Sequence, residues 1–143
     1  VMWQAALGMI KDRPILGQGV NTFMANYLHY WVGGEQQPRY AHNCYLQMWA
    51  ETGVVGFGAF LWLLWGMVGL WRRAVSWLSN GPPRYMLLGL LASLVAFLVQ
   101  AALDTNFYSM RQAFLFWTLA GMATGLAAGN TTQPSHGRLR QDA

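Results

Sequence analysis

Three long apolar stretches dominate the chain from residue 54 to residue 128. They cover residues 54–71, 86–103 and 113–128, and none of them contains a charged side chain. As a helix, each of the first two stretches is about 27 Å long, close to the ~30 Å hydrocarbon core of a bilayer. The pattern therefore predicts an all-α integral membrane protein with about three transmembrane helices.

Polar residues mark the segments that connect these stretches. Residues 72–85 contain three arginines and a Pro-Pro pair, which predicts a loop at the cytoplasmic face. Residues 104–112 begin with an aspartate and predict a short loop at the opposite face. Residues 129–143 are polar, and their composition predicts a disordered cytoplasmic tail.

The first 53 residues show a different pattern, in which short apolar stretches are interrupted by prolines and glycines. Residues 1–10 are almost wholly apolar and fit either the end of an earlier span or a helix that lies in the membrane interface. Pro14 disfavours helix at the residue before it, so this first helix should end there. Gly17 and Gly19 predict a plain turn rather than a phosphate-binding loop, since no P-loop lysine accompanies them. We expect residues 1–53 to form a loop region with short helices on the outer side.

Composition supports the membrane assignment. Hydrophobic residues make up 55% of the chain and charged residues only 10%, whereas soluble domains have about a quarter charged residues. The single cysteine, Cys44, excludes an internal disulfide and a cysteine metal site. We expect no metal, no cofactor and no nucleic-acid partner. Since the chain begins at Val1, we expect it to be part of a larger polytopic bundle.

The basic residues predict the orientation of the spans. The positive-inside rule counts arginines and lysines near the spans, and here it favours a cytoplasmic 72–85 loop and tail by five to four. The cytoplasmic residues are Arg72, Arg73, Arg84, Arg138 and Arg140, and the outer ones are Lys11, Arg13, Arg39 and Arg111.

Candidate chemistry is concentrated in residues 38–53, just before the first apolar stretch. We expect a short helix there, closed by a left-handed glycine cap at Gly53. His42 and Asn43 would lie near its N-terminus, where partial positive charge disfavours imidazolium. A neutral histidine can accept a proton and suits a general base. The alternative is a histidine that only caps the helix.

Four cations share the predicted outer face with His42, namely Arg39, Lys11, Arg13 and Arg111. Guanidinium groups match phosphate oxygens, so such a set could bind the diphosphate of a lipid carrier. The alternative is that these cations anchor the protein to anionic lipid headgroups. Asp104, on the same face, either orients a partner such as Arg111 or only marks the end of a helix.

The His42-Asn43 pair is followed, nine residues later, by Gly53-x-x-Gly56. This spacing resembles the signature of the O-antigen ligase and O-antigen polymerase family of membrane glycosyltransferases. Two further stretches are similar to that family: one from Trp3 to Phe23 and one from Asp104 to Gly121. The resemblance covers roughly residues 3–128.

The resemblance implies a bacterial inner-membrane protein whose multiple spans carry an active site on the periplasmic face, so that 1–53 and 104–112 are periplasmic. Family members transfer a glycan from undecaprenyl diphosphate to an acceptor hydroxyl without a metal. By resemblance, His42 is the catalytic base, Asn43 positions the substrate or caps the helix, and Arg39 with the other outer cations holds the diphosphate. The acceptor is lipid A core, a growing polysaccharide or a protein. Two alternatives are a polymerase of the same family and a non-enzymatic membrane transporter.

Overall fold

The computed structural model describes residues 2–31, 33 and 40–129, and this part of the chain is helical without a strand. The expected tail therefore lies outside the described residues except for Gly129. The elements, in order, are α1 (Met2–Asp12), α2 (Phe23–Asn26), the 3₁₀ helix η1 (Tyr27–Tyr30), α3 (Cys44–Trp77), α4 (Pro82–Ala101), the 3₁₀ helix η2 (Asn106–Tyr108) and α5 (Met110–Gly129).

Two helices have the properties of membrane spans. In the described part, α3 and α4 are long and apolar enough to cross a bilayer. The third apolar stretch forms α5, a helix of 20 residues, which is less apolar and does not qualify by the same measure. The all-helical prediction is confirmed, and two of the three expected spans are supported; a membrane crossing by α5 stays a prediction.

The helices extend further into residues 72–85 than the sequence indicates. Helix α3 continues past Arg72 and Arg73 to Trp77, and α4 already begins at Pro82, so the connection is a turn at residues 78–81. Arginine is a good helix former and does not end a helix where its side chain reaches water. Proline is favoured in the first turn of a helix, because the amide it lacks has no helical partner there.

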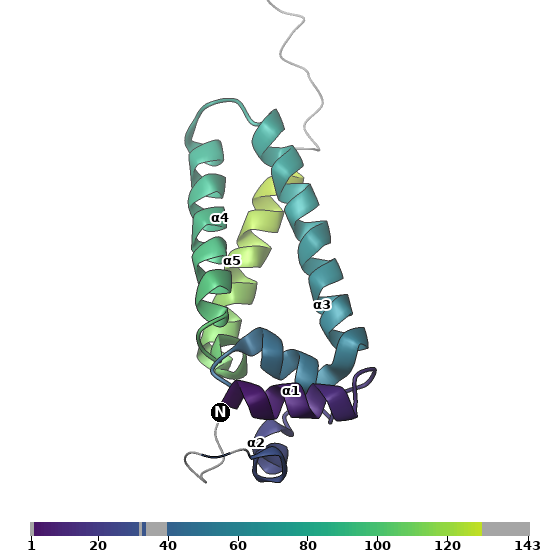
Figure 1. Ribbon diagram of the computed structural model, residues 1–143. Helices are drawn as coiled ribbons and strands as arrows, with labels where there is room; N and C mark the ends of the chain where they lie inside the picture. The colour runs from purple at the N-terminus through teal and green to yellow at the C-terminus, as the bar shows by residue number, and fades with distance from the viewer. Residues whose placement is uncertain (1, 32, 34–39, 130–143) are drawn as a thin grey trace, which may run out of the picture.

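The three long helices pack around an aromatic and alanine-rich core. Phe116 of α5 is fully buried and contacts the rings of Phe97 and Phe107, with centroid distances of 5.0 and 4.9 Å. Trp71 of α3 donates a hydrogen bond from Nε1 to Oγ1 of Thr124 on α5, at 3.2 Å. These contacts join α3, α4 and α5 into one bundle (Figure 1).

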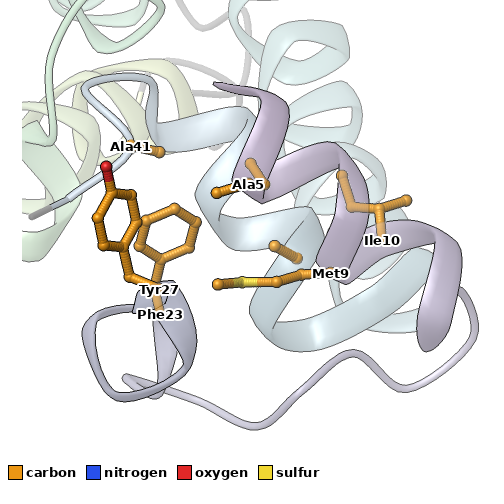
Figure 2. Packing of buried hydrophobic residues seen from close by; sticks show 8 residues of the cluster. Ala5, Met9, Ile10, Phe23, Tyr27 and Ala41 are labelled. Carbon is orange, nitrogen blue, oxygen red and sulfur yellow. The ribbon is translucent and has the colours of Figure 1, made fainter. Parts of the chain in front are cut away.

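Helix α1 lies across one end of this bundle, against the first turns of α3 (Figure 1). Its buried face is part of a second core, where Met9 points toward the rings of Phe23 and Tyr27 (Figure 2). The members of this core are Ala5, Ala6, Met9, Ile10, Phe23, Tyr27, Ala41 and Ala50. Residues 2–31 thus form a small helical layer at the end of the bundle that carries the start of α3.

Helix α3 is broken at Gly53, which has φ 64° and ψ −171°. The expected short helix and its end at a glycine of positive φ are confirmed, although ψ of Gly53 differs from that of the expected left-handed cap. The two helical segments on either side follow one another without a loop. The break leaves amides and carbonyls of α3 without helical hydrogen-bond partners. The backbone of residues 14–19 provides the missing partners. The hydrogen bonds run from Val54 N to Pro14 O (2.9 Å), Val55 N to Ile15 O (3.3 Å), Gln18 N to Ala50 O (2.9 Å) and Gly19 N to Glu51 O (2.9 Å).

The close packing of backbone at the break in α3 explains why glycine occurs at several positions. Gly17 has φ +70°, and a Cβ there would overlap the backbone of Glu51. A Cβ on Gly53 would overlap the carbonyl of Ile15, and one on Gly56 would meet the side chain of Thr52. The plain turn expected at Gly17 and Gly19 is confirmed, since the amides of Gln18 and Gly19 are bonded to α3 rather than open to a phosphate.

Candidate functional site

The loop before α3 presents His42 at the end of the bundle that faces α1. Asn43 is the N-cap of α3, and its Oδ1 accepts a hydrogen bond from the amide of Leu46 at 3.0 Å. The capping role therefore belongs to Asn43. His42 precedes the cap with φ 49°, in the left-handed region that side chains seldom adopt and that is enriched at functional sites.

His42 lies beside Asp104, which comes from the segment between α4 and η2. The two atoms in contact are His42 Nδ1 and Asp104 Oδ1, at 3.4 Å, and each side chain is about half exposed, at 49% and 50%. A histidine whose Nδ1–H faces a carboxylate presents Nε2 as its proton acceptor. Within the described part, Nε2 of His42 makes no hydrogen bond, and the side chain is about half exposed. Of the two roles expected for Asp104, orientation of a partner fits, but the partner is His42 rather than Arg111.

Asp104 is itself held in place by its neighbours. Its Oδ1 accepts a hydrogen bond from the amide of Thr105 at 2.7 Å, and its carbonyl accepts one from the amide of Cys44 at 3.2 Å. The Thr105 amide, and secondarily His42, hold the pKa of Asp104 below its usual value. The carboxylate therefore stays ionised at neutral pH. The Cys44 bond ties Asp104 to the first residue of α3, two positions after His42.

The segment that follows His42 also contains a buried carboxylate, Glu51, which the sequence did not single out. Glu51 is only 1% exposed, and its two oxygens accept four hydrogen bonds. The donors are the amides of Asn21 (2.8 Å) and Phe23 (3.1 Å), Nε2 of Gln47 (3.3 Å) and the hydroxyl of Tyr108 (3.0 Å). Burial, and then the charge of Glu51, raise the pKa of Tyr108 well above its usual value. Glu51 thus joins α3 to residues 21–23 and to η2.

The Glu51 network also supports the loop that carries His42. Gln47, fully buried, donates to Glu51 and accepts a hydrogen bond from the amide of Ala41 at 3.1 Å. Tyr40 packs on Tyr108, with a centroid distance of 6.1 Å. The one signal in the sequence was the spacing of Gln47 and Glu51, which places both polar side chains on one face of a short helix.

Among the described residues, none of the predicted cations forms a hydrogen bond or ion pair with His42 or Asp104. Lys11 and Arg13 are exposed at the end of α1, and Arg111 is exposed in the first turn of α5. No ion pair between these residues and Asp104 occurs among the described residues, and Arg39 lies outside them. Nor is any group of three or more His, Cys, Asp or Glu in that part placed to hold a metal.

The fold and the site define a helical membrane protein with a histidine–aspartate pair at one end of its spans. A family model described as "O-Antigen ligase" matches residues 1–61, which include His42, Asn43 and the Gly53-x-x-Gly56 pair. The match confirms the resemblance to this family over those residues. Together with the apolar helices α3 and α4, the match supports a bacterial membrane protein.

One curated relative is a protein of Haemophilus influenzae (strain Rd) described only as an uncharacterized protein. It is 33% identical over 69 residues, which is 44% of this chain and 17% of the relative. The chain therefore aligns with a small part of that protein. No solved structure matches the chain.

Proposed function

We propose that this chain belongs to an inner-membrane glycosyltransferase that transfers a glycan from undecaprenyl diphosphate to an acceptor hydroxyl on the periplasmic face. The observation that carries the proposal is the contact of 3.4 Å between His42 Nδ1 and Asp104 Oδ1. The family match over residues 1–61 supports the reaction class.

In the proposed mechanism, His42 Nε2 removes the proton of the acceptor hydroxyl as its oxygen attacks the anomeric carbon of the donor sugar. The bond between that carbon and the phosphate oxygen breaks, and undecaprenyl diphosphate leaves with the electron pair. Asp104 acts on the base: it holds Nδ1–H, fixes the ring and stabilises the imidazolium that forms. Lipid A core, a growing polysaccharide and a protein hydroxyl all fit this chemistry. A polymerase of the same family differs only in its acceptor.

The test is transfer by the full-length protein in vesicles, with a lipid-linked glycan as donor. Since attack and departure occur on opposite faces of the anomeric carbon, the new linkage should have inverted configuration. Nuclear magnetic resonance of the product measures it. A retained configuration would require a covalent glycosyl intermediate and would contradict the single displacement proposed here.

The diphosphate is proposed to bind Arg39, with Arg111, Arg13 and Lys11 as further outer cations. Arg39→Lys should keep the fold but weaken donor use, because a point charge replaces a bidentate fork. Losing one charge-assisted hydrogen bond costs about 1.5–3 kcal/mol, which is roughly a 10- to 150-fold loss at limiting donor. Arg73→Lys, at the opposite end of α3, is the matched control and should leave the rate unchanged. An unchanged rate in Arg39→Lys would make Arg39 a headgroup anchor.

The periplasmic placement of the site also has a direct test. Cys44 is fully buried against Asp104 and Phe107, so it is a poor target for labelling. In a Cys44→Ala background without other cysteines, Met110→Cys and Ser79→Cys place single thiols at opposite ends of the bundle. Met110 is 88% exposed, and Ser79 is exposed in the α3–α4 turn. In intact cells an impermeant maleimide should label Met110→Cys and spare Ser79→Cys; the reverse result would place the site in the cytoplasm.

A further inference from the structure

The end of the bundle opposite His42 has two neighbouring cavities between α3 and α4, both open at the surface of the bundle. The first has a volume of about 450 Å³ and lies at the turn; we call it the arginine cavity. It is lined by Arg72, Val75, Ser76, Arg84, Leu88 and Leu91. The second, the apolar cavity, has a volume of about 150 Å³ and is lined by Val68, Trp71, Arg72, Leu91, Leu94, Val95 and Leu98. Arg72 and Leu91 line both, so the cavities adjoin along the two helices.

Among the residues that the structure describes, Arg72 and Arg84 form no ion pair with a carboxylate. Residues 52–103 contain no aspartate or glutamate, so neither helix offers a carboxylate after Glu51. Arg84 donates one hydrogen bond, from Nη1 to the carbonyl of Leu78 at 3.1 Å. The guanidinium group of Arg72 makes no hydrogen bond to a described residue. Guanidinium groups whose N–H donors have no carboxylate partner are complementary to phosphate oxygens.

The surroundings place this region at the level of lipid headgroups. Trp77 and Tyr85, on the two sides of the turn, are 82% and 63% exposed. Exposed tryptophan and tyrosine at a helix end are typical of a membrane–water interface. The apolar cavity runs from there toward the middle of the bundle, where an acyl chain would lie.

We propose that the arginine cavity and the apolar cavity together bind one anionic glycerophospholipid. Its phosphate lies between Arg72 and Arg84, and one acyl chain follows α3 and α4 through the apolar cavity. The site is separate from the proposed active site, since residues 54–72 of α3 span about 27 Å. A free phosphate has no acyl chain to fill the apolar cavity. A neutral lipid would leave both arginines without a counter-charge. Basic pockets between spans are a recognised place for anionic headgroups.

The test measures lipid retention by the full-length protein in detergent, with phosphatidylglycerol and phosphatidylcholine as probes and native mass spectrometry as the readout. We expect phosphatidylglycerol to be retained in preference. The double variant Arg72→Gln/Arg84→Gln should retain it about 30-fold less well, since each arginine near a lipid surface contributes roughly a fivefold factor. Arg73→Gln is the matched control: Arg73 is exposed at the same end but lines neither cavity, and its loss should have little effect.

A second arm separates a lipid from a free phosphate. Val95 is 60% exposed and lines the apolar cavity, so Val95→Trp should fill the cavity with little effect on the fold. This variant should retain less phosphatidylglycerol although both arginines remain. Glycerol 3-phosphate at millimolar concentration should not displace the lipid from the wild type.

Each contrary result would overturn the proposal. Equal retention of the two lipids, or an equal loss in Arg73→Gln, would indicate diffuse attraction to the membrane. Displacement by glycerol phosphate would indicate an anion site, and no change in any variant would mean that another part of the protein or a second copy covers both cavities. The wild type gives an independent check if a variant misfolds. A phosphatidylglycerol with a photoreactive acyl chain should form adducts at residues 68–72 and 91–98, and adducts confined to other segments would contradict the assignment.

Discussion

Replacing His42 with alanine is expected to lower glycan transfer by about 10²- to 10⁴-fold, which is the usual contribution of general-base catalysis. The side chain is about half exposed, and its described contact is the 3.4 Å approach to Asp104. Its removal should therefore leave the bundle intact. The measurement is turnover by purified full-length protein at saturating lipid-linked donor, with membrane insertion and thermal unfolding compared with the wild type.

Two neighbouring substitutions show whether the loss is chemical or structural. Asn43→Ala removes the N-cap of α3 and should cost about 1 kcal/mol of stability, with a smaller effect on turnover. Asp104→Asn should lower turnover less than His42→Ala, because Asp104 assists the histidine and does not itself take the proton from the substrate. His42→Ala combined with Asp104→Asn should then be no slower than His42→Ala alone. Near-normal turnover in His42→Ala would mean that the base lies elsewhere in the protein.

The helices of the bundle follow directly from the apolar pattern, since a run without charges can only be buried or placed in lipid. The helix end at Gly53 could also be predicted from the sequence, because a glycine between a short polar helix and an apolar one indicates a position of positive φ. Helix ends were less accurate. The apolar pattern predicts the boundary of the membrane and not the end of the helix. Helix α3 continues past Arg72 and Arg73 for another turn.

The side chain that contacts His42 could not be predicted from the sequence. Asp104 is 62 residues away, and the contact depends on how the end of α4 packs against the start of α3. Nothing in the local sequence distinguishes an aspartate that ends a helix from one that orients a base. The same holds for Glu51, which appears in the sequence as one acidic residue among apolar ones. Its role becomes visible only when residues 21–23 and Tyr108 are placed around it.

The largest effect on stability is expected from Gly53→Ala. Gly53 has φ 64°, where an L side chain costs roughly 1–3 kcal/mol in strain alone. In addition, the new Cβ would overlap the carbonyl of Ile15, so residues 14–19 would have to leave α3. Four backbone groups of α3 would then lose their partners, namely the amides of Val54 and Val55 and the carbonyls of Ala50 and Glu51. The variant should unfold at a clearly lower temperature, and transfer should fall as well, because the first segment of α3 carries the His42 loop.

The same substitution at Gly58 is the matched control. Gly58 lies five residues further along α3, and a Cβ there meets no atom within 4 Å. Alanine is the better helix former by about 1 kcal/mol, so Gly58→Ala should unfold at the same temperature as the wild type or a slightly higher one. The first segment can be followed separately through Cys44, since a shift of this segment away from Asp104 and Phe107 should make the buried thiol reactive in Gly53→Ala and not in Gly58→Ala. If Gly53→Ala unfolds like Gly58→Ala and keeps Cys44 protected, α3 can run straight through residue 53, and the break does not position the site.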